Sequence, residues 1–281
     1  MKKIGIIGRG FVGSAVEFGF SAQTGCNASV KIFDTNPKLS LHTLNETIND
    51  SEYVFLSVPT PSNEDGSINL DIIDSALQSI NEINTVDNII LIRSTITPGT
   101  TRKFQEKFSK LNLVFNPEFL TERSAKYDFI NQSRFILGGD KLNTEKVALL
   151  FKWRFGDSIP VIETNFETAE LIKYMNNCFF ATKVSFLNEM KMISDKVGAD
   201  WETSVEGFVR DGRIGHSHLS VPGPDGKFGF GGSCFPKDMQ ALIDFAKKID
   251  IELNTLKGAW DTNLLVRPDK DWEKLKGRSV T

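Results

Sequence analysis

The stretch Ile4-Gly-Ile-Ile-Gly-Arg-Gly-Phe-Val-Gly13 decides the fold of this 281-residue chain. Its apolar start predicts a buried β-strand, and the pattern G-x-G-x-x-G lies between that strand and a helix predicted from about Phe11 to Ala22. The next apolar run, Val30 to Phe33, ends in Asp34, about 20 residues past the last glycine. This order of elements predicts a dinucleotide-binding βαβ unit.

The glycines and the acidic residue indicate which dinucleotide is bound. Glycines allow a tight turn and close approach of a pyrophosphate, which the free N–H groups of a helix N-terminus can bind. A carboxylate at the end of the second strand accepts hydrogen bonds from ribose hydroxyls and repels a 2′-phosphate, so we expect NAD rather than NADP. The predicted cofactor contacts here are Gly8, Gly10, Phe11, Val12, Gly13 and Asp34.

The rest of the first half alternates short apolar runs with helical spacing. Further strands are predicted at 53–58, 88–92, 112–115 and 135–137, and helices at 70–83, 100–110 and 144–155. Strands that alternate with helices form a parallel sheet covered on both faces. We therefore predict an α/β protein whose residues 1–163 form a Rossmann-type, doubly wound, NAD-binding domain.

The second half has a different pattern. Thr164 and Glu167 have the spacing of a capping box, with Thr164 as the N-cap of a long helix over 166–197. Apolar residues recur along that helix as one broad stripe, which suits either a dimer interface or a core within the chain. Shorter helices are predicted at 201–208, 237–249 and 256–265, so residues 164–281 are expected to form an all-helical central domain.

The amino-acid composition limits the kinds of partner that the chain is expected to bind. The net charge of −3 gives no general attraction to nucleic acid or to an anionic membrane, and no run of eighteen apolar residues is present. Three widely spaced cysteines and no export signal indicate free thiols in a reducing compartment, so we expect a cytoplasmic protein. The three histidines have no cysteine or further histidine near them that would complete a metal site, so none is predicted.

The run Gly229-Phe-Gly-Gly-Ser-Cys-Phe-Pro-Lys-Asp238 places Cys234 in a glycine-rich turn. A nearby cation such as Lys237 favours the thiolate, and a carboxylate such as Asp238 can take a proton from water. These residues suit covalent catalysis. Without other evidence, however, a lone cysteine in a glycine-rich loop is more often a structural thiol.

Taken together, the motifs resemble those of the nucleotide-sugar 6-dehydrogenases. The matching elements, in chain order, are Gly8–Gly13, Asp34, Val58–Pro61, Ser94–Thr95, Asn116–Glu122, Lys173 with Asn177, Asn188–Glu189, Arg213–Gly215 and Gly229–Asp238. The resemblance implies an NAD-dependent, four-electron oxidation of a sugar C6 alcohol through a thiohemiacetal and a thioester on Cys234. UDP-glucose is the first candidate substrate, giving UDP-glucuronate. GDP-mannose and a non-catalytic NAD-binding subunit are the alternatives.

The resemblance also implies roles for single residues. It makes Cys234 the nucleophile, Lys173 and Asn177 the oxyanion donors, and Asp238 with Thr95 the groups that handle water and protons. It assigns catalytic roles to Cys234, Lys173, Asn177, Asp238, Thr95 and Glu118. It adds Pro59, Thr60, Thr95, Glu122 and Lys237 to the cofactor contacts. It assigns substrate contacts to Glu118, Phe119, Leu120, Lys173, Asn177, Arg213, Phe228 and Gly231.

Two further expectations concern organisation. The helix over 166–197 resembles the core of the family's dimer, so a homodimer is expected. Members of the family have a third domain for the nucleotide, and this sequence stops at about the position where that domain would begin. We therefore expect the chain to lack the C-terminal UDP-binding domain.

Overall fold

The computed structural model describes residues 1–281 and divides them into two compact units. The first unit holds residues 1–60 and 70–173, and the second holds residues 61–69 and 174–281. The start of the long helix α7 (Phe166–Val197) belongs to the first unit because Phe166 and Ala169 are buried in its core. The predicted domains, 1–163 and 164–281, stay a prediction, and the compact units are bounded differently.

The first unit contains a seven-stranded sheet in the order β2-β1-β3-β4-β5-β6-β7. The strands are β1 (Lys2–Ile7), β2 (Ala28–Phe33), β3 (Tyr53–Leu56), β4 (Ile89–Ile92), β5 (Asn112–Phe115), β6 (Phe135–Gly139) and β7 (Val161–Thr164). All neighbours are parallel except β5 and β6, which are antiparallel. The predicted Rossmann-type fold is confirmed, with β6 and β7 opposed in direction to the other five strands.

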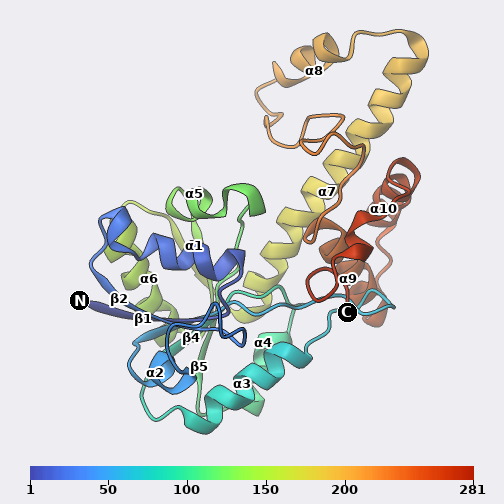
Figure 1. Cartoon of the computed structure of the whole chain (residues 1–281). Coiled ribbons are helices and arrows are strands. Elements are labelled where there is room, and N and C mark those ends of the chain that lie inside the picture. The colour runs from blue at the N-terminus through green and yellow to red at the C-terminus, as the bar shows by residue number, and fades with distance from the viewer. The chain divides into compact units, whose positions relative to one another are not determined.

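Alternating side chains explain why helices cover both faces of the sheet. Phe55 of β3 and Leu91 of β4 enter one core, whereas their neighbours Val54 and Ile90 enter the other. The strands therefore have no polar face, and each face needs its own layer of helices. Figure 1 shows α1 (Phe11–Gly19), α5 (Ala125–Ile130) and α6 (Lys141–Phe155) on one side, and α2 (Leu44–Asn49), α3 (Asp71–Ile83) and α4 (Thr100–Lys107) on the other.

An aromatic cluster fills the core beneath α1, α5 and α6. The rings of Phe135 and Phe151 are stacked with centroids 3.9 Å apart, and Phe129 meets Phe135 edge-on at 6.5 Å. Phe20 and Phe55 extend the cluster toward β3. Such pairs contribute beyond the apolar area they bury.

The second unit is mostly helical, as predicted. It contains the rest of α7 with α8 (Trp201–Val209), α9 (Phe235–Lys248) and α10 (Asn254–Val266). Tyr174 and Cys178 of α7 pack with Met239 of α9 and Ala259 of α10 in one buried cluster. No regular helix or strand lies between residues 210 and 234.

The predicted capping box at the start of α7 was wrong. Thr164 is taken up by β7, and Asn165 acts as the cap because its Oδ1 accepts the Thr168 N–H at 2.8 Å. Glu167 instead bonds to Arg102. A true capping box occurs at α2, between Thr43 and Glu46.

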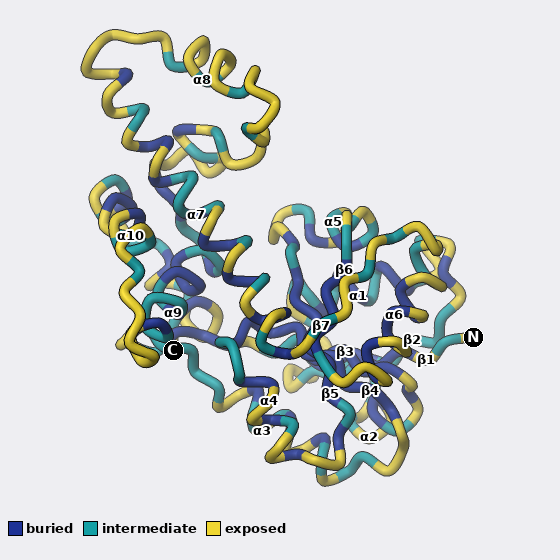
Figure 2. Tube along the Cα trace, turned by 180° about the vertical axis from the view of Figure 1, so that it is seen from behind, coloured by how far each residue is buried: buried dark blue, intermediate teal, exposed yellow.

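The apolar stripe of α7 divides into two rows. Leu187 is buried within the unit, whereas Met175, Phe179 and Phe186 are 62%, 65% and 47% exposed. In Figure 2, exposed and buried positions alternate along α7, and most of α8 is exposed. One side of α7 therefore serves the core of the second unit, and the other offers apolar side chains to solvent.

Phe135→Ala tests the aromatic core. Removing a fully buried, stacked ring leaves a cavity, so the free energy of unfolding should fall by about 3–5 kcal/mol. Denaturant unfolding followed by circular dichroism measures the change. Leu142→Ala, at a site 74% exposed on α6, is the control and should unfold like the wild type. Equal stability of all three proteins would contradict the prediction.

Candidate active site

The glycine turn after β1 is crowded on one side and open on the other. Gly8 has a left-handed φ of +89°, and a Cβ there would lie 2.6 Å from the Ser57 carbonyl oxygen. A Cβ on Gly13 would overlap the Gly8 carbonyl oxygen. A Cβ on Gly10, in contrast, would meet nothing within 4 Å. The turn therefore requires glycine at 8 and 13 for packing, and at 10 it leaves open space at the N-terminus of α1.

Asp34 lies directly beside this turn. Its Oδ2 accepts the backbone N–H of Arg9 at 2.6 Å, and its Oδ1 accepts the N–H of Asn36 at 2.8 Å. The N-cap of α1, Gly10, has no side chain to occupy the first N–H groups of the helix. Open space, free helix N–H groups and an adjacent carboxylate are the features that fit a dinucleotide's pyrophosphate and ribose.

The other cofactor candidates lie on neighbouring segments. Phe11 and Val12 form the first turn of α1 and are half-buried, whereas Pro59 and Glu122 are exposed. Thr60 is buried, and its hydroxyl donates to the Thr95 carbonyl at 2.8 Å. That bond joins the turns that follow β3 and β4.

The loop after β5 contributes a buried ion pair. Lys173 Nζ donates to Glu118 Oε1 at 2.7 Å and to the Glu118 carbonyl at 2.6 Å. Both side chains are more than nine-tenths buried. The second carboxylate oxygen accepts the Leu120 N–H at 2.8 Å, so the loop is held through its backbone and its side chain.

A second buried cation lies next to this loop. Arg93, at the end of β4, is 1% exposed and donates from Nη1 to Asn116 Oδ1. Asn116 in turn donates to the Ile136 carbonyl at 2.9 Å, which links the loop to β6. Burial lowers the pKa of Arg93 to about 10, and the Glu118 carboxylate works against that change. The guanidinium is therefore still charged at neutral pH.

Glu170 anchors α7 one turn before Lys173. Its carboxylate accepts the N–H groups of Gly99 and Thr101 at 2.6 and 2.8 Å, and the Thr101 hydroxyl at 2.6 Å. Burial raises the pKa of Glu170 to about 7, although the hydrogen bonds from Thr101 and Gly99 oppose the shift. The contact holds the start of α4, just after the Thr95 turn.

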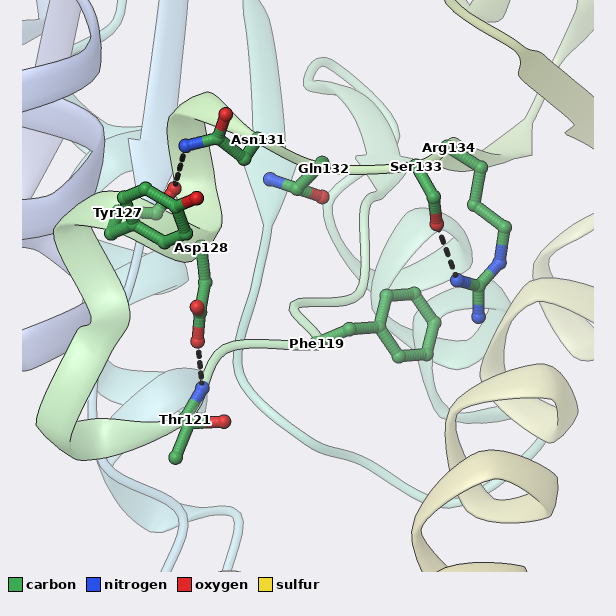
Figure 3. A pocket seen from close by; sticks show the side chains of 8 residues that line it. All are labelled: Phe119, Thr121, Tyr127, Asp128, Asn131, Gln132, Ser133 and Arg134. Atoms are coloured by element: carbon green, nitrogen blue, oxygen red, sulfur yellow. Dashed lines mark hydrogen bonds between the residues drawn. The ribbon is translucent and has the colours of Figure 1, made fainter. Parts of the chain in front are cut away.

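A cavity of about 320 Å³ adjoins the Glu118 loop. Figure 3 shows Phe119 and Thr121 on one wall, with Gln132, Ser133 and Arg134 on the segment that leads into β6. The Arg134 guanidinium lies 4.4 Å from the Phe119 ring centroid, and Lys173 Nζ lies 5.5 Å from the same centroid. Phe119, a predicted substrate contact, thus borders both the buried ion pair and an open, polar cavity.

In the second unit, Cys234 is the N-cap of α9, and its carbonyl accepts the N–H of Asp238 at 2.9 Å. Asp238 is 1% exposed. Its carboxylate accepts Asn177 Nδ2 at 2.6 Å and Lys237 Nζ at 2.7 Å. A negative charge is favoured at a helix N-terminus, so the position of Cys234 suits a thiolate.

The remaining predicted substrate contacts, Arg213, Phe228 and Gly231, differ in exposure and in their contacts. Arg213 is exposed and pairs with Asp211 two residues earlier. Phe228 is 39% exposed, and a Cβ on Gly231 would overlap the Arg267 guanidinium. Glycine at position 231 is therefore required by packing inside the second unit.

Four side chains that hold these groups in place had no role assigned from the sequence: Arg93, Asn116, Glu170 and Arg267. Of these, Asn116 begins a matched motif. Arg93 precedes the Ser94-Thr95 pair directly, and Glu170 lies three residues before Lys173, hence on a neighbouring part of the same helix surface. Those spacings were visible in the sequence. Nothing local to Arg267 pointed to its partners, Asp225 and Asp271.

The fold and the glycine turn define a dinucleotide-binding α/β protein with a helical second unit. Comparison with known proteins agrees. Residues 23–152 match the NAD binding domain of the UDP-glucose/GDP-mannose dehydrogenase family, and residues 167–264 match that family's central domain. The chain belongs to this family, and NAD is its cofactor, as predicted. No helix is both long and apolar enough to cross a membrane.

Individual relatives point the same way. UDP-glucose 6-dehydrogenase YwqF of Bacillus subtilis is 36% identical over 222 residues, covering 76% of this chain and 48% of that protein. UDP-glucose 6-dehydrogenase of Rickettsia prowazekii is 37% identical over 246 residues, covering 81% and 54%. The chain spans about half the length of these two relatives.

Solved structures share the fold. A UDP-glucose dehydrogenase from Pyrobaculum islandicum superposes with a TM-score of 0.82 at 27% identity, covering 94% of this chain and 68% of that one. GDP-mannose dehydrogenase from Pseudomonas aeruginosa gives a TM-score of 0.67 at 25% identity, covering 99% and 71%. Both similarities extend over nearly the whole chain.

Gly10→Ala and Gly13→Ala should separate cofactor binding from packing. Gly10→Ala puts a methyl group into the open space beside α1, so NAD binding should weaken by about tenfold or more while the fold persists. Gly13→Ala forces a backbone overlap and should cost about 1–3 kcal/mol of stability. Calorimetric NAD titration and thermal unfolding measure the two effects. Full NAD affinity in Gly10→Ala would contradict the assignment of the pyrophosphate to this turn.

Proposed function

We propose that this chain oxidises the C6 alcohol of a nucleotide sugar to a carboxylate, with UDP-glucose as the substrate and UDP-glucuronate as the product. The observation that carries the proposal is Cys234 at the start of α9, one turn before a buried Asp238 that Asn177 and Lys237 hold. Similarity to proteins named UDP-glucose 6-dehydrogenase supports the choice of sugar.

The proposed chemistry has three stages. Two NAD molecules, bound one after the other, would each accept one hydride. Loss of a hydride and a proton converts the alcohol to an aldehyde, and the Cys234 thiolate then adds to its carbonyl carbon to give a thiohemiacetal. Loss of a second hydride and of the hydroxyl proton gives a thioester, and water then breaks the C–S bond to release the acid and the Cys234 thiolate. A thiolate suits this sequence because it is a strong nucleophile and a good leaving group.

Each side chain is assigned a catalytic role from its contacts and its position. Asp238 is a buried carboxylate one turn from Cys234, and we assign it the proton of the hydrolytic water. Lys173 and Asn177 lie four residues apart on α7, about one turn, and are assigned to the oxyanion. Lys173 Nζ already donates to Glu118, which orients the ammonium before substrate binds. Thr95 and Glu118 are assigned to the water network.

Lys237 has a different proposed role from the one first expected. We expected it to raise the local potential around the thiolate, and its Nζ donates to Asp238 Oδ1 at 2.7 Å. Its charge therefore acts on the carboxylate directly. We propose that it orients the Asp238 carboxylate beside Cys234.

Two alternatives remain. GDP-mannose is favoured by the likeness to the Pseudomonas aeruginosa structure. The other is a non-catalytic NAD-binding role. The Cys234, Lys173 and Asp238 side chains would have no chemical task in a non-catalytic subunit, so we favour the enzyme.

Purified protein should form two NADH for each UDP-glucose consumed. Absorbance at 340 nm measures the NADH. Cys234→Ser should form no acid, because a serine alkoxide is not available to capture the aldehyde at neutral pH. Mass spectrometry of the sugar product checks the acid. Faster turnover of GDP-mannose would select the first alternative. NAD binding without turnover of any nucleotide sugar would select the second.

We also propose a homodimer through α7. Met175, Phe179, Phe186 and Ile193 leave an apolar row exposed along the helix, at spacings of four and seven residues. Rows of this kind on one helix suit pairing with an identical helix across a two-fold axis.

Phe179→Glu should convert the dimer to a monomer, because it places a charge in the proposed apolar interface. Light scattering after size-exclusion chromatography measures the mass. Leu149→Glu is the control, since Leu149 is also 65% exposed but lies on α6. The proposal fails if Phe179→Glu and wild type have the same mass.

A further inference from the structure

Arg267 is a buried cation at the end of α10, with 3% exposure. Its Nε donates to Asp271 Oδ1 at 2.6 Å, and its Nη2 donates to Asp225 Oδ2 at 2.6 Å. The remaining terminal nitrogen, Nη1, lies 3.3 Å from the Phe228 carbonyl oxygen and donates to it. One guanidinium therefore joins α10, the 3₁₀ turn at 271–274 and the loop that leads to Cys234.

Arg267 and Asp271 pack directly against residues 228–234, here called the cysteine loop. Asp271 Oδ2 accepts the Gly232 N–H at 3.3 Å, two residues before Cys234. A Cβ on Gly231 would overlap both Arg267 Nη2 and Asp271 Oδ1. The ion pair thus forms the surface on which the glycines of this loop lie.

Two amides complete the support of the loop backbone. Asn263 Oδ1 accepts the Phe230 N–H at 2.7 Å, and its Nδ2 donates to the Phe230 carbonyl at 3.0 Å. Asn188 Oδ1 accepts the Gly229 N–H at 3.0 Å. Because the loop has no regular secondary structure, these side chains supply the hydrogen bonds that a helix or strand would otherwise supply.

The two carboxylates that bind Arg267 are charged. Burial acts to raise the pKa of Asp225 and of Asp271, but the hydrogen bonds from Arg267 and from a backbone N–H, together with the Arg267 charge, hold each pKa below its ordinary value. Both carboxylates are therefore ionised at neutral pH. A buried arginine with two carboxylate partners loses them only at a large energetic cost.

We propose that Arg267, Asp225 and Asp271, here called the arginine lock, are positioning residues that hold the cysteine loop and so set the reactivity of Cys234. None of the three is assigned to the substrate or to NAD. The catalytic meaning of the lock rests on the proposed role of Cys234 as the nucleophile. The physical claim, that the lock governs the thiol, stands without it.

The lock also gives a reason for the stretch Pro222-Gly-Pro-Asp-Gly226. Asp225 lies in this stretch and bonds to both Arg267 and the Lys227 N–H. The turn is closed by the Gly223 N–H, which donates to the Lys227 carbonyl at 2.7 Å. The turn therefore presents a carboxylate to the buried guanidinium.

The test measures the alkylation rate of Cys234 by iodoacetamide in the intact 281-residue chain, with each cysteine followed by peptide mass spectrometry. Cys26 and Cys178 are 7% and 3% exposed and serve as internal references for unfolding. Arg267→Met removes the charge and the hydrogen bonds but keeps much of the apolar volume. We expect a several-fold faster alkylation of Cys234, with Cys26 and Cys178 unchanged. We also expect a lower kcat with an unchanged KM for NAD.

Two further variants distinguish positioning from general stability. Arg267→Lys keeps the charge without the guanidinium fork, so it should restore part of the wild-type alkylation rate. Asp269→Asn is the matched control, since it breaks the neighbouring but exposed pair with Lys227 and should alkylate like the wild type. A structural role alone would shift the thermal midpoint of Arg267→Met without moving the Cys234 rate.

The outcomes separate the lock from the proposed function. Wild-type alkylation and kcat in a folded Arg267→Met would overturn the lock. If Arg267→Met does not fold, Asp271→Asn decides, because it removes the charge that accepts the Gly232 N–H, and an unchanged Cys234 rate there also overturns the lock. Faster Cys234 alkylation in these variants would uphold the lock even if the wild type oxidises no nucleotide sugar, and that failure would count only against the proposed function.

Discussion

The buried ion pair between Lys173 and Glu118 is the contact on which the site of the first unit depends. An unpaired buried charge is energetically costly, so the Lys173 ammonium and the Glu118 carboxylate each stabilise the other. The same ammonium donates to the Glu118 carbonyl, and Glu118 in turn accepts the Leu120 N–H, which fixes the loop after β5. With Glu170 bonded to the start of α4, the first turns of α7 are fastened to two loops that follow neighbouring strands.

The two glycine-rich segments, residues 8–13 and 228–232, differ in what lies beside their glycines. At Gly8–Gly13 the closest contacts of Gly8 and Gly13 are with backbone atoms, and the space beside Gly10 is open. At 228–232 the space beside Gly231 is filled by Arg267 and Asp271. One segment therefore borders open space at the N-terminus of α1, whereas the other packs against Arg267 and Asp271 just before Cys234.

Much of the fold could be predicted because it depends on local patterns. Buried strands such as β3 and β4 are continuous apolar runs, and α7 ends where Gly198 follows. The start of α7 was misjudged because Thr164 is recruited into β7 by pairing with β6, a contact remote in the sequence. The direction of β6 was missed for a similar reason, since an apolar run does not show which way its strand points.

Motifs and their spacing were enough to predict the glycine turn after β1, the acidic residue that follows β2, the family, and the place of Cys234 just before a helix. Those features need only spacing along the chain. Only the packed chain shows which polar groups meet: Lys173 with Glu118, Asp238 with Asn177, and Arg267 with Asp225 and Asp271. It also shows which row of α7 is buried. The physical reason is that burial makes an unpaired charge or amide costly, and its partner is chosen by packing between segments far apart in the chain.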